Sequence, residues 1–184
     1  MTRSLASLCV CVCLASALGA QSHELKKEKE ILAKIEAAAN SGDNATLVSE
    51  CDALLEGHQI SAFAWYLCGK HLLSVKTTDL GVARANTRTA YVRLEKATRD
   101  FKRTGKQLYL ALDGEQFMGL AAMLLGDYDR AQVHFRAVLA RDNRMAAAWY
   151  NLGVLYEMKG LTDESMRSFD RYLRLVGAGK DSEF

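Results

Sequence analysis

The stretch Ala148-Trp149-Tyr150-Asn151-Leu152-Gly153-Val154-Leu155-Tyr156 decides the fold of this chain. Within it, four residues recur at i, i+3, i+4 and i+7, which places them on one face of a helix: Trp149, Leu152, Gly153 and Tyr156. Gly153 has no side chain, so a neighbouring helix can approach closely at that point. The pattern therefore predicts a helix that packs one apolar face against a partner helix.

The surrounding sequence repeats with a period of 34 residues, the distance from Gly119 to Gly153. Three further pairs keep this spacing: Gly126 with Gly160, Ala131 with Ser165, and Phe135 with Phe169. Upstream, the segment 62–72 copies 146–156, with Trp65 and Gly69 in the places of Trp149 and Gly153. The chain is therefore built from repeated pairs of helices.

A helix–turn–helix unit with Trp, Leu-Gly and Tyr, followed by Ala and Phe, resembles the tetratricopeptide repeat family. The resemblance implies an all-α solenoid of about four helical hairpins, because no hairpin buries its apolar stripes alone. We expect a repeat domain at 20–179 and a tail at 180–184. The expected units are 28–61, 62–111, 112–145 and 146–179.

The second unit is sixteen residues longer than the period. Phe101 lies one period before Phe135, which places the extra residues between Leu73 and about Ala90. The segment 82–103 contains no helix breaker. It predicts one long helix that projects beyond the stack, or a short helix followed by a regular one.

Composition narrows the class of protein. The chain has 184 residues, 49% of them hydrophobic, no proline and a net charge of +2. The apolar content is typical of a folded globular chain. A charge near zero does not indicate nucleic-acid binding. The absence of proline fits a mostly helical chain with short connections.

The first 19 residues are interpreted as a secretory signal peptide. Arg3 supplies a positive start, the segment 5–18 is uncharged and short for a membrane span, and Ala17 and Gly19 suit a cleavage site. We therefore expect an exported protein, periplasmic in a bacterium and otherwise in the secretory pathway. An uncleaved anchor and a lipidated signal are the alternatives, and only these imply membrane association.

Two cysteines, Cys51 and Cys68, follow the signal. The resemblance places them on packed faces of the first two units, and an exported compartment permits a disulfide there. Two buried thiols that simply pack together are the alternative.

The sequence gives no sign of catalytic chemistry. The four histidines lack paired metal-ligand spacing, and the chain has no phosphate loop and no Gly-x-Ser-x-Gly motif. We expect a protein that is not an enzyme and uses no cofactor or metal.

The resemblance implies that the first helix of each unit lines a concave groove. The expected groove residues are Phe63, Tyr66, Lys70, Gln116, Leu120, Met123, Tyr150, Asn151, Val154 and Met158. Tyrosine and methionine suit adaptable recognition. The sequence thus favours an adaptor or scaffold that binds a peptide or partner helix. The alternative is a carrier of an apolar small ligand, lined by Met123, Met158 and Tyr150.

The inserted segment is the most basic part of the chain. Its arginines suggest a patch for an anionic partner, either an acidic protein or a membrane surface: Arg84, Arg88, Arg99 and Arg103. A solvated helix face is the alternative, because the charges spread around the helix.

Overall fold

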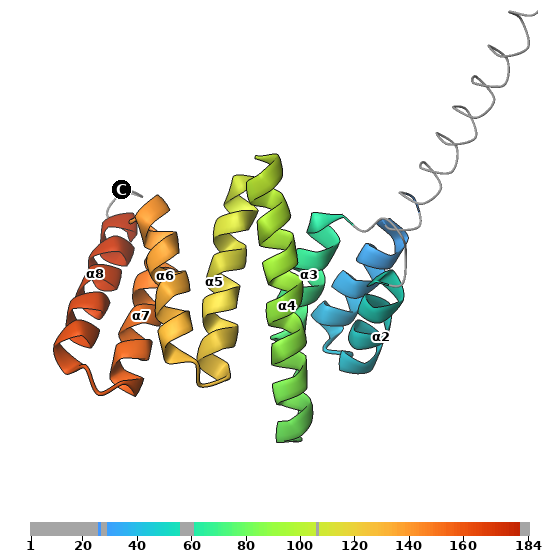
Figure 1. The fold of residues 1–184 in the computed structure, drawn as a ribbon, viewed down its shortest axis with the longest axis horizontal. Coiled ribbons are helices and arrows are strands. Elements are labelled where there is room, and N and C mark those ends of the chain that lie inside the picture. The colour runs from blue at the N-terminus through green and yellow to red at the C-terminus, as the bar shows by residue number, and fades with distance from the viewer. Residues whose placement is uncertain (1–25, 27–28, 56–60, 106, 181–184) are drawn as a thin grey trace, which may run out of the picture. The chain divides into compact units, whose positions relative to one another are not determined.

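The computed structural model describes residues 26, 29–55, 61–105 and 107–180 (Figure 1). Among these residues the regular structure is helical, without strands. The signal peptide expected at 1–19 and the end of the tail lie outside the described residues. The chain divides into two compact units, residues 1–60 and residues 61–184.

The described part of the first unit is a hairpin of a helix at 29–41 and α2 (Asn44–Leu55). Gly42 turns the chain with a φ of 74°. Asp43 then caps α2, because its side chain accepts a hydrogen bond of 3.1 Å from the Thr46 N–H. A hydrogen bond from the Thr46 side chain, together with this one, lowers the pKa of Asp43. Ile35, Leu47 and Cys51 fill the space between the two helices.

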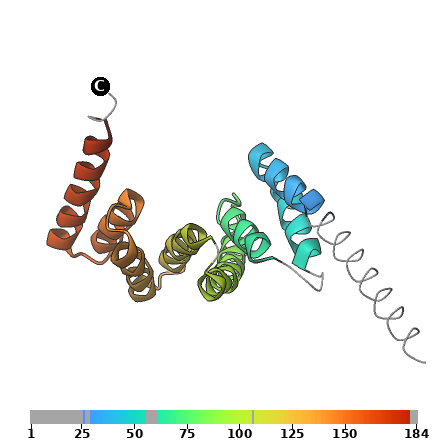
Figure 2. The ribbon, with the colours of Figure 1, turned by 90° about the horizontal axis from the view of Figure 1, so that it is seen from above.

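The second unit contains three helical hairpins in sequence. They are α3 (Ala62–Leu72) with α4 (Leu80–Thr104), α5 (Leu108–Leu124) with α6 (Tyr128–Arg141), and α7 (Ala146–Met158) with α8 (Thr162–Lys180). Each helix packs against the next along the chain, and α5 also contacts α3 and α7. In Figure 2, α3, α5 and α7 follow one side of the row, and α4 and α6 the other. The expected all-α solenoid of helical hairpins is confirmed.

In the second unit, a glycine in the first helix of each hairpin sets the distance to the second helix. A Cβ atom on Gly119 would lie 2.5 Å from the Phe135 ring, and one on Gly153 would lie 2.6 Å from the Phe169 ring. Only glycine leaves room for the aromatic ring here. Between the helices, Gly126 and Gly160 have φ values of 82° and 72°, which turn the chain.

The long helix of the second expected unit is confirmed, and α4 runs past α3 and α5 at its N-terminal end (Figure 1). Asp79 begins α4 by accepting hydrogen bonds from the Gly81 and Val82 N–H groups.

The placement of the inserted residues was wrong in part. Gly69 faces Leu94, not Phe101, since a Cβ on Gly69 would lie 2.7 Å from the Leu94 side chain. These two positions are 25 apart, against 16 for Gly119 with Phe135. Nine of the sixteen added residues therefore precede Leu94, and seven follow it. The hairpin is lengthened at both ends, and α5 begins at Leu108, ahead of position 112.

Two clusters of buried side chains form the core of the second unit. One joins α3, α4 and α5 around Tyr66, Leu94 and Phe101. The other joins α5, α6 and α7 around Phe135 and Leu155. The half-buried Tyr91 of α4 packs against both clusters, so the neighbouring hairpins share one continuous core.

Candidate binding site

The expected groove residues lie on α3, α5 and α7, which contact one another in sequence. At the α3 end, three aromatic rings form a strip. Ring centroids are 6.2 Å apart for Phe63 and Tyr66, and 6.5 Å apart for Tyr66 and Phe117. The Lys70 ammonium lies 5.4 Å from the Phe117 ring centroid, within reach of a cation–π contact.

Tyr66 is part of the core and does not face solvent. It is 4% exposed, and its hydroxyl donates a hydrogen bond to the carboxylate of Asp113. Burial and the Asp113 carboxylate raise the pKa of Tyr66. Gln116 occupies the equivalent place in the next repeat and is also buried. Leu120 and Met123 of the same helix are half-buried. The bond from Tyr66 to Asp113 therefore joins α3 to α5, and the two buried side chains, Tyr66 and Gln116, leave contact with a ligand to other residues.

The α7 end of the groove is more open. Tyr150 is 47% exposed and Met158 is 52% exposed, with the half-buried Asn151 and Val154 between them. The Tyr150 ring is also held in place from α8, because its centroid lies 5.8 Å from Phe169 and 5.3 Å from that of Tyr172. An exposed ring fixed by two others is a preorganised surface for a partner.

An open pocket of about 640 Å³ lies beside the turn between α5 and α6. Met123 and Met158 line it together with Leu72, Leu73 and the projecting end of α4 at Leu80. Two of the three residues predicted for an apolar ligand thus share a pocket. Tyr150 is not among its lining residues.

A polar network links α4, α5 and α6. Its centre is Glu115, which pairs with Lys102 and accepts a hydrogen bond of 2.6 Å from Nδ1 of His134. The other ring nitrogen of His134 lies 2.9 Å from the Tyr91 hydroxyl. Burial raises the pKa of Glu115, but the bonds from His134 and Lys102 outweigh it and lower that pKa below the ordinary value.

No motif in the sequence gave His134 a partner, so this network was not predicted. A signal for it exists, because Glu115 stands one period before Trp149, where the repeat usually has a tryptophan. An acidic residue at a buried position needs a partner. His134 supplies it from 19 residues away.

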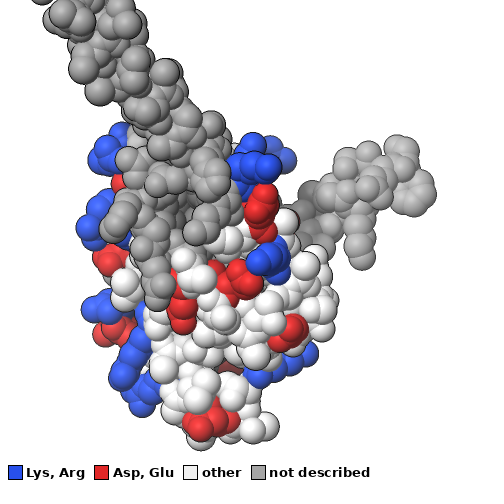
Figure 3. All heavy atoms as spheres, turned by 90° about the vertical axis from the view of Figure 1, so that its right-hand side faces the viewer, with Lys and Arg blue, Asp and Glu red and all other residues white. Residues whose placement is uncertain are grey.

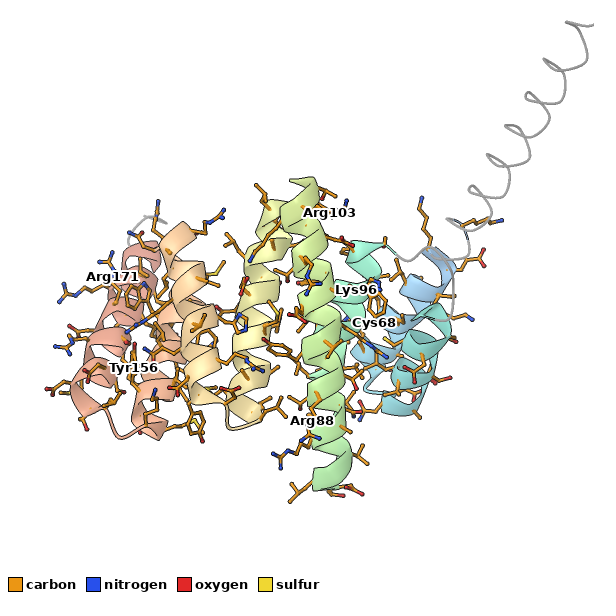
Figure 4. The ribbon with its side chains drawn as sticks, viewed as in Figure 1. Cys68, Arg88, Lys96, Arg103, Tyr156 and Arg171 are labelled. Atoms are coloured by element: carbon orange, nitrogen blue, oxygen red, sulfur yellow. The ribbon has the colours of Figure 1, made fainter. Side chains whose placement is uncertain are left out.

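The predicted basic patch divides into two pairs along α4. Figure 4 shows Arg88 near the N-terminal end of α4 and Arg103 near its C-terminal end. Arg99 pairs with Glu95 at 3.5 Å, and Arg103 with Asp100 at 3.2 Å. Figure 3 shows the side of Figure 1 on which α2 lies, and acidic and basic side chains are interspersed among the described residues there. The charges of α4 are thus partly neutralised within the helix itself.

Cys51 and Cys68 are both buried, one in each of the two units. Their predicted disulfide would join the units and stays a prediction. In the described ranges, no three His, Cys, Asp or Glu side chains gather as a metal site. Among the same residues, none of the helices is long and apolar enough to cross a membrane.

The helical hairpins and the glycine–phenylalanine contacts are arranged as in tetratricopeptide repeats. Residues 118–180 match the model of the tetratricopeptide repeat family, which confirms the resemblance seen in the sequence. These repeats form a fold whose general use is to bind other proteins.

Two solved structures, both of MamA, are similar to the chain. One has a TM-score of 0.66 at 18% identity and covers 85% of this chain and 81% of that chain. The other has a TM-score of 0.67 at 17% identity and covers 89% and 80%. At these identities the likeness shows the fold. No curated protein matches the chain.

Proposed function

We propose that this protein is a scaffold that binds a peptide or a partner helix on the face formed by α3, α5 and α7. The observation that carries the proposal is Tyr150. Its ring is nearly half exposed, yet Phe169 and Tyr172 hold it in one position. Such a ring loses little conformational freedom when a partner covers it.

The surroundings of Tyr150 support an adaptable apolar contact. Met158, Val154 and Leu120 present flexible or aliphatic side chains on the same set of helices, and Asn151 adds a hydrogen-bonding amide. Each anchor that becomes fully buried contributes about 1.5–3 kcal/mol, before the cost of ordering the partner. A partner with two or three apolar side chains on one face would therefore bind measurably.

Native mass spectrometry of the protein purified from its own host tests this proposal. We expect a bound polypeptide, and we expect its loss in a Tyr150→Ala, Met158→Ala double variant. Tyr150→Phe keeps the ring and should retain the partner. Val133→Ala removes a 65% exposed side chain from α6, outside the groove, and serves as the matched control. Retention of the polypeptide by the double variant would refute the groove as its site.

The second candidate is a carrier of an apolar small ligand. It is favoured by the pocket of about 640 Å³ in which Met123 and Met158 meet Leu72 and Leu80. Pockets of this size, lined by apolar side chains, are typical of small-molecule sites. In the same measurement, a retained low-mass compound that Met123→Ala releases would favour the carrier over the scaffold.

Export is a further part of the proposal. It rests on the sequence of residues 1–19, with Ala17 and Gly19 at the expected cleavage site. We expect the mature protein from its host to begin at Ala20. Amino-terminal sequencing checks this, and a mature chain that still begins at Met1 would contradict it.

A further inference from the structure

A second pocket, of about 630 Å³, lies between α6, α7 and α8. Its apolar lining includes Leu139, Trp149 and Leu152, and the rest is dominated by arginines from the two flanking helices. The arginines are Arg136, Arg167 and Arg171. The groove proposed above uses none of these residues, so the two sites are distinct.

The repeats differ at two positions that line this pocket. One period separates Glu115 from Trp149 and His134 from Ser168. In the earlier repeat, Glu115 of α5 and His134 of α6 are hydrogen-bonded to each other. In the later repeat, Ser168 is small, and its hydroxyl donates back to the Glu164 carbonyl oxygen at 2.7 Å. In the later repeat, Trp149 and Ser168 line the pocket in place of such a pair.

The charges around the pocket select for an anion. Three guanidinium groups and one carboxylate line the pocket. The carboxylate is that of Glu164, which lies 3.6 Å from Arg167. Arg136 is held toward the pocket because it donates a hydrogen bond of 3.1 Å to the Tyr156 hydroxyl. Figure 4 marks Tyr156 on α7 and Arg171 on α8, two of the helices that border the pocket.

Guanidinium groups bind carboxylates through paired hydrogen bonds, which favours arginine wherever carboxylates are recognised. The apolar floor formed by Trp149, Leu152 and Leu139 suits an aliphatic or aromatic group. A ligand that matches both features carries carboxylates next to an apolar side chain.

We propose that this pocket binds an acidic segment of a partner protein. One apolar side chain of the segment enters the floor, and neighbouring Asp or Glu side chains pair with Arg136 and Arg171. Because these arginines lie on α6 and α8, and the groove lies on α3, α5 and α7, the scaffold has binding sites on two faces.

Fluorescence anisotropy on the full chain tests this assignment. The probe is a labelled peptide of sequence Asp-Glu-Leu-Asp-Phe-Glu-Glu-Leu. One control peptide replaces every acid by its amide, and a second replaces Leu and Phe by Ser. We expect both control peptides to bind at least about tenfold more weakly than the probe, since each loses one of the two kinds of contact.

Two matched double variants locate the site. Arg136→Gln with Arg171→Gln removes two charges from the pocket. Lys29→Gln with Lys34→Gln removes the same charge from exposed residues of the first unit and is the control. We expect the pocket variant to bind the probe about tenfold or more weakly and the control variant to stay within about twofold. Arg171→Gln alone repeats the test without disturbing the bond from Arg136 to Tyr156.

Three results would overturn the proposal. The first is an acidic probe that binds no better than its amide control at concentrations up to about 1 mM. The second is an equal loss of affinity in both double variants, which would mean general attraction to a basic chain. The third is a dimer in sedimentation velocity that the pocket variant dissociates, which would assign the pocket to a second copy of the chain.

Discussion

Nδ1 of His134 lies 2.6 Å from a carboxylate oxygen of Glu115, and this pair ties α6 to α5 in the middle of the repeat array. Both side chains are nearly buried, with 14% and 10% of their surfaces exposed. The next hairpin cannot form this bond, because its corresponding positions are Trp149 and Ser168. Polar pairing thus joins the helices of one hairpin at positions that line a pocket in the next.

Replacing Glu115 by Gln should lower the free energy of unfolding by about 1–3 kcal/mol at neutral pH, since it weakens charged hydrogen bonds to two partners. The folded state lowers the pKa of Glu115 from its ordinary value of 4.5. The stability that this carboxylate adds is therefore present above that pH and is lost as the pH falls below it. Urea unfolding of both proteins at neutral and acidic pH measures the difference. If the two proteins differ in their free energy of unfolding by the same amount at acidic pH, the Glu115 charge does not contribute to stability.

Gly153→Ala should destabilise the protein by about 1–3 kcal/mol, because the added Cβ would lie 2.6 Å from the Phe169 ring and the core must shift. Gly177→Ala is the control. It lies in α8 with no atom within 4 Å of an added Cβ, and alanine there should add up to about 1 kcal/mol through helix propensity. Thermal unfolding of the two variants should shift in opposite directions. Equal shifts of the melting temperature would mean that the Phe169 ring does not exclude a side chain at position 153.

Tyr66→Ala should cost about 3–5 kcal/mol of stability, because Tyr66 is buried in the core between α3, α4 and α5. Tyr150→Ala should cost far less, since the Tyr150 ring is nearly half exposed. Guanidinium unfolding separates the two variants. If both lose similar stability, Tyr150 is a structural residue and its use as a binding anchor fails.

Gln107→Gly should stabilise the protein by about 0.5–1 kcal/mol. Gln107 precedes α5 with a φ of 54°, in the left-handed region, which costs a side-chain-bearing residue about 1–2 kcal/mol. Glycine adopts this conformation without that cost, although it gives up part of the gain as entropy of the unfolded chain. Gln107→Ala keeps the strain and should show no such gain in the same thermal unfolding assay.

The repeat frame was predictable because its evidence lies in regular spacing. Gly119, Gly153 and their phenylalanine partners recur at one period, and the structure packs them against each other. The two-sided extension of α4 was not predictable in the same way. Phe101 stands at the right distance to imitate the phenylalanine of a normal repeat, but Leu94 meets Gly69. Periodicity gives the spacing of residues along the chain. It does not show which of two apolar residues packs against the neighbouring helix.

The candidate sites were predictable only in outline. The resemblance places the groove on the first helices, but it does not reveal that Tyr66 and Gln116 are buried between those helices whereas Tyr150 is not. The arginine-rich pocket depends on Arg136, Arg167 and Arg171 meeting across two helices. Such a meeting depends on side-chain directions, and residues more than thirty positions apart leave no local pattern in the sequence.

Tyr91 packs against both core clusters of the second unit, and this position has a consequence for how the array comes apart. Repeat arrays behave approximately as chains of units coupled only to their neighbours, so weak junctions open before strong ones. The junction that Tyr91 and His134 build should make the hairpins α3–α4 and α5–α6 lose amide protection together in hydrogen exchange. At the far end, Leu173 and Met166 of α8 are more than half exposed, so the last hairpin should exchange first and separately.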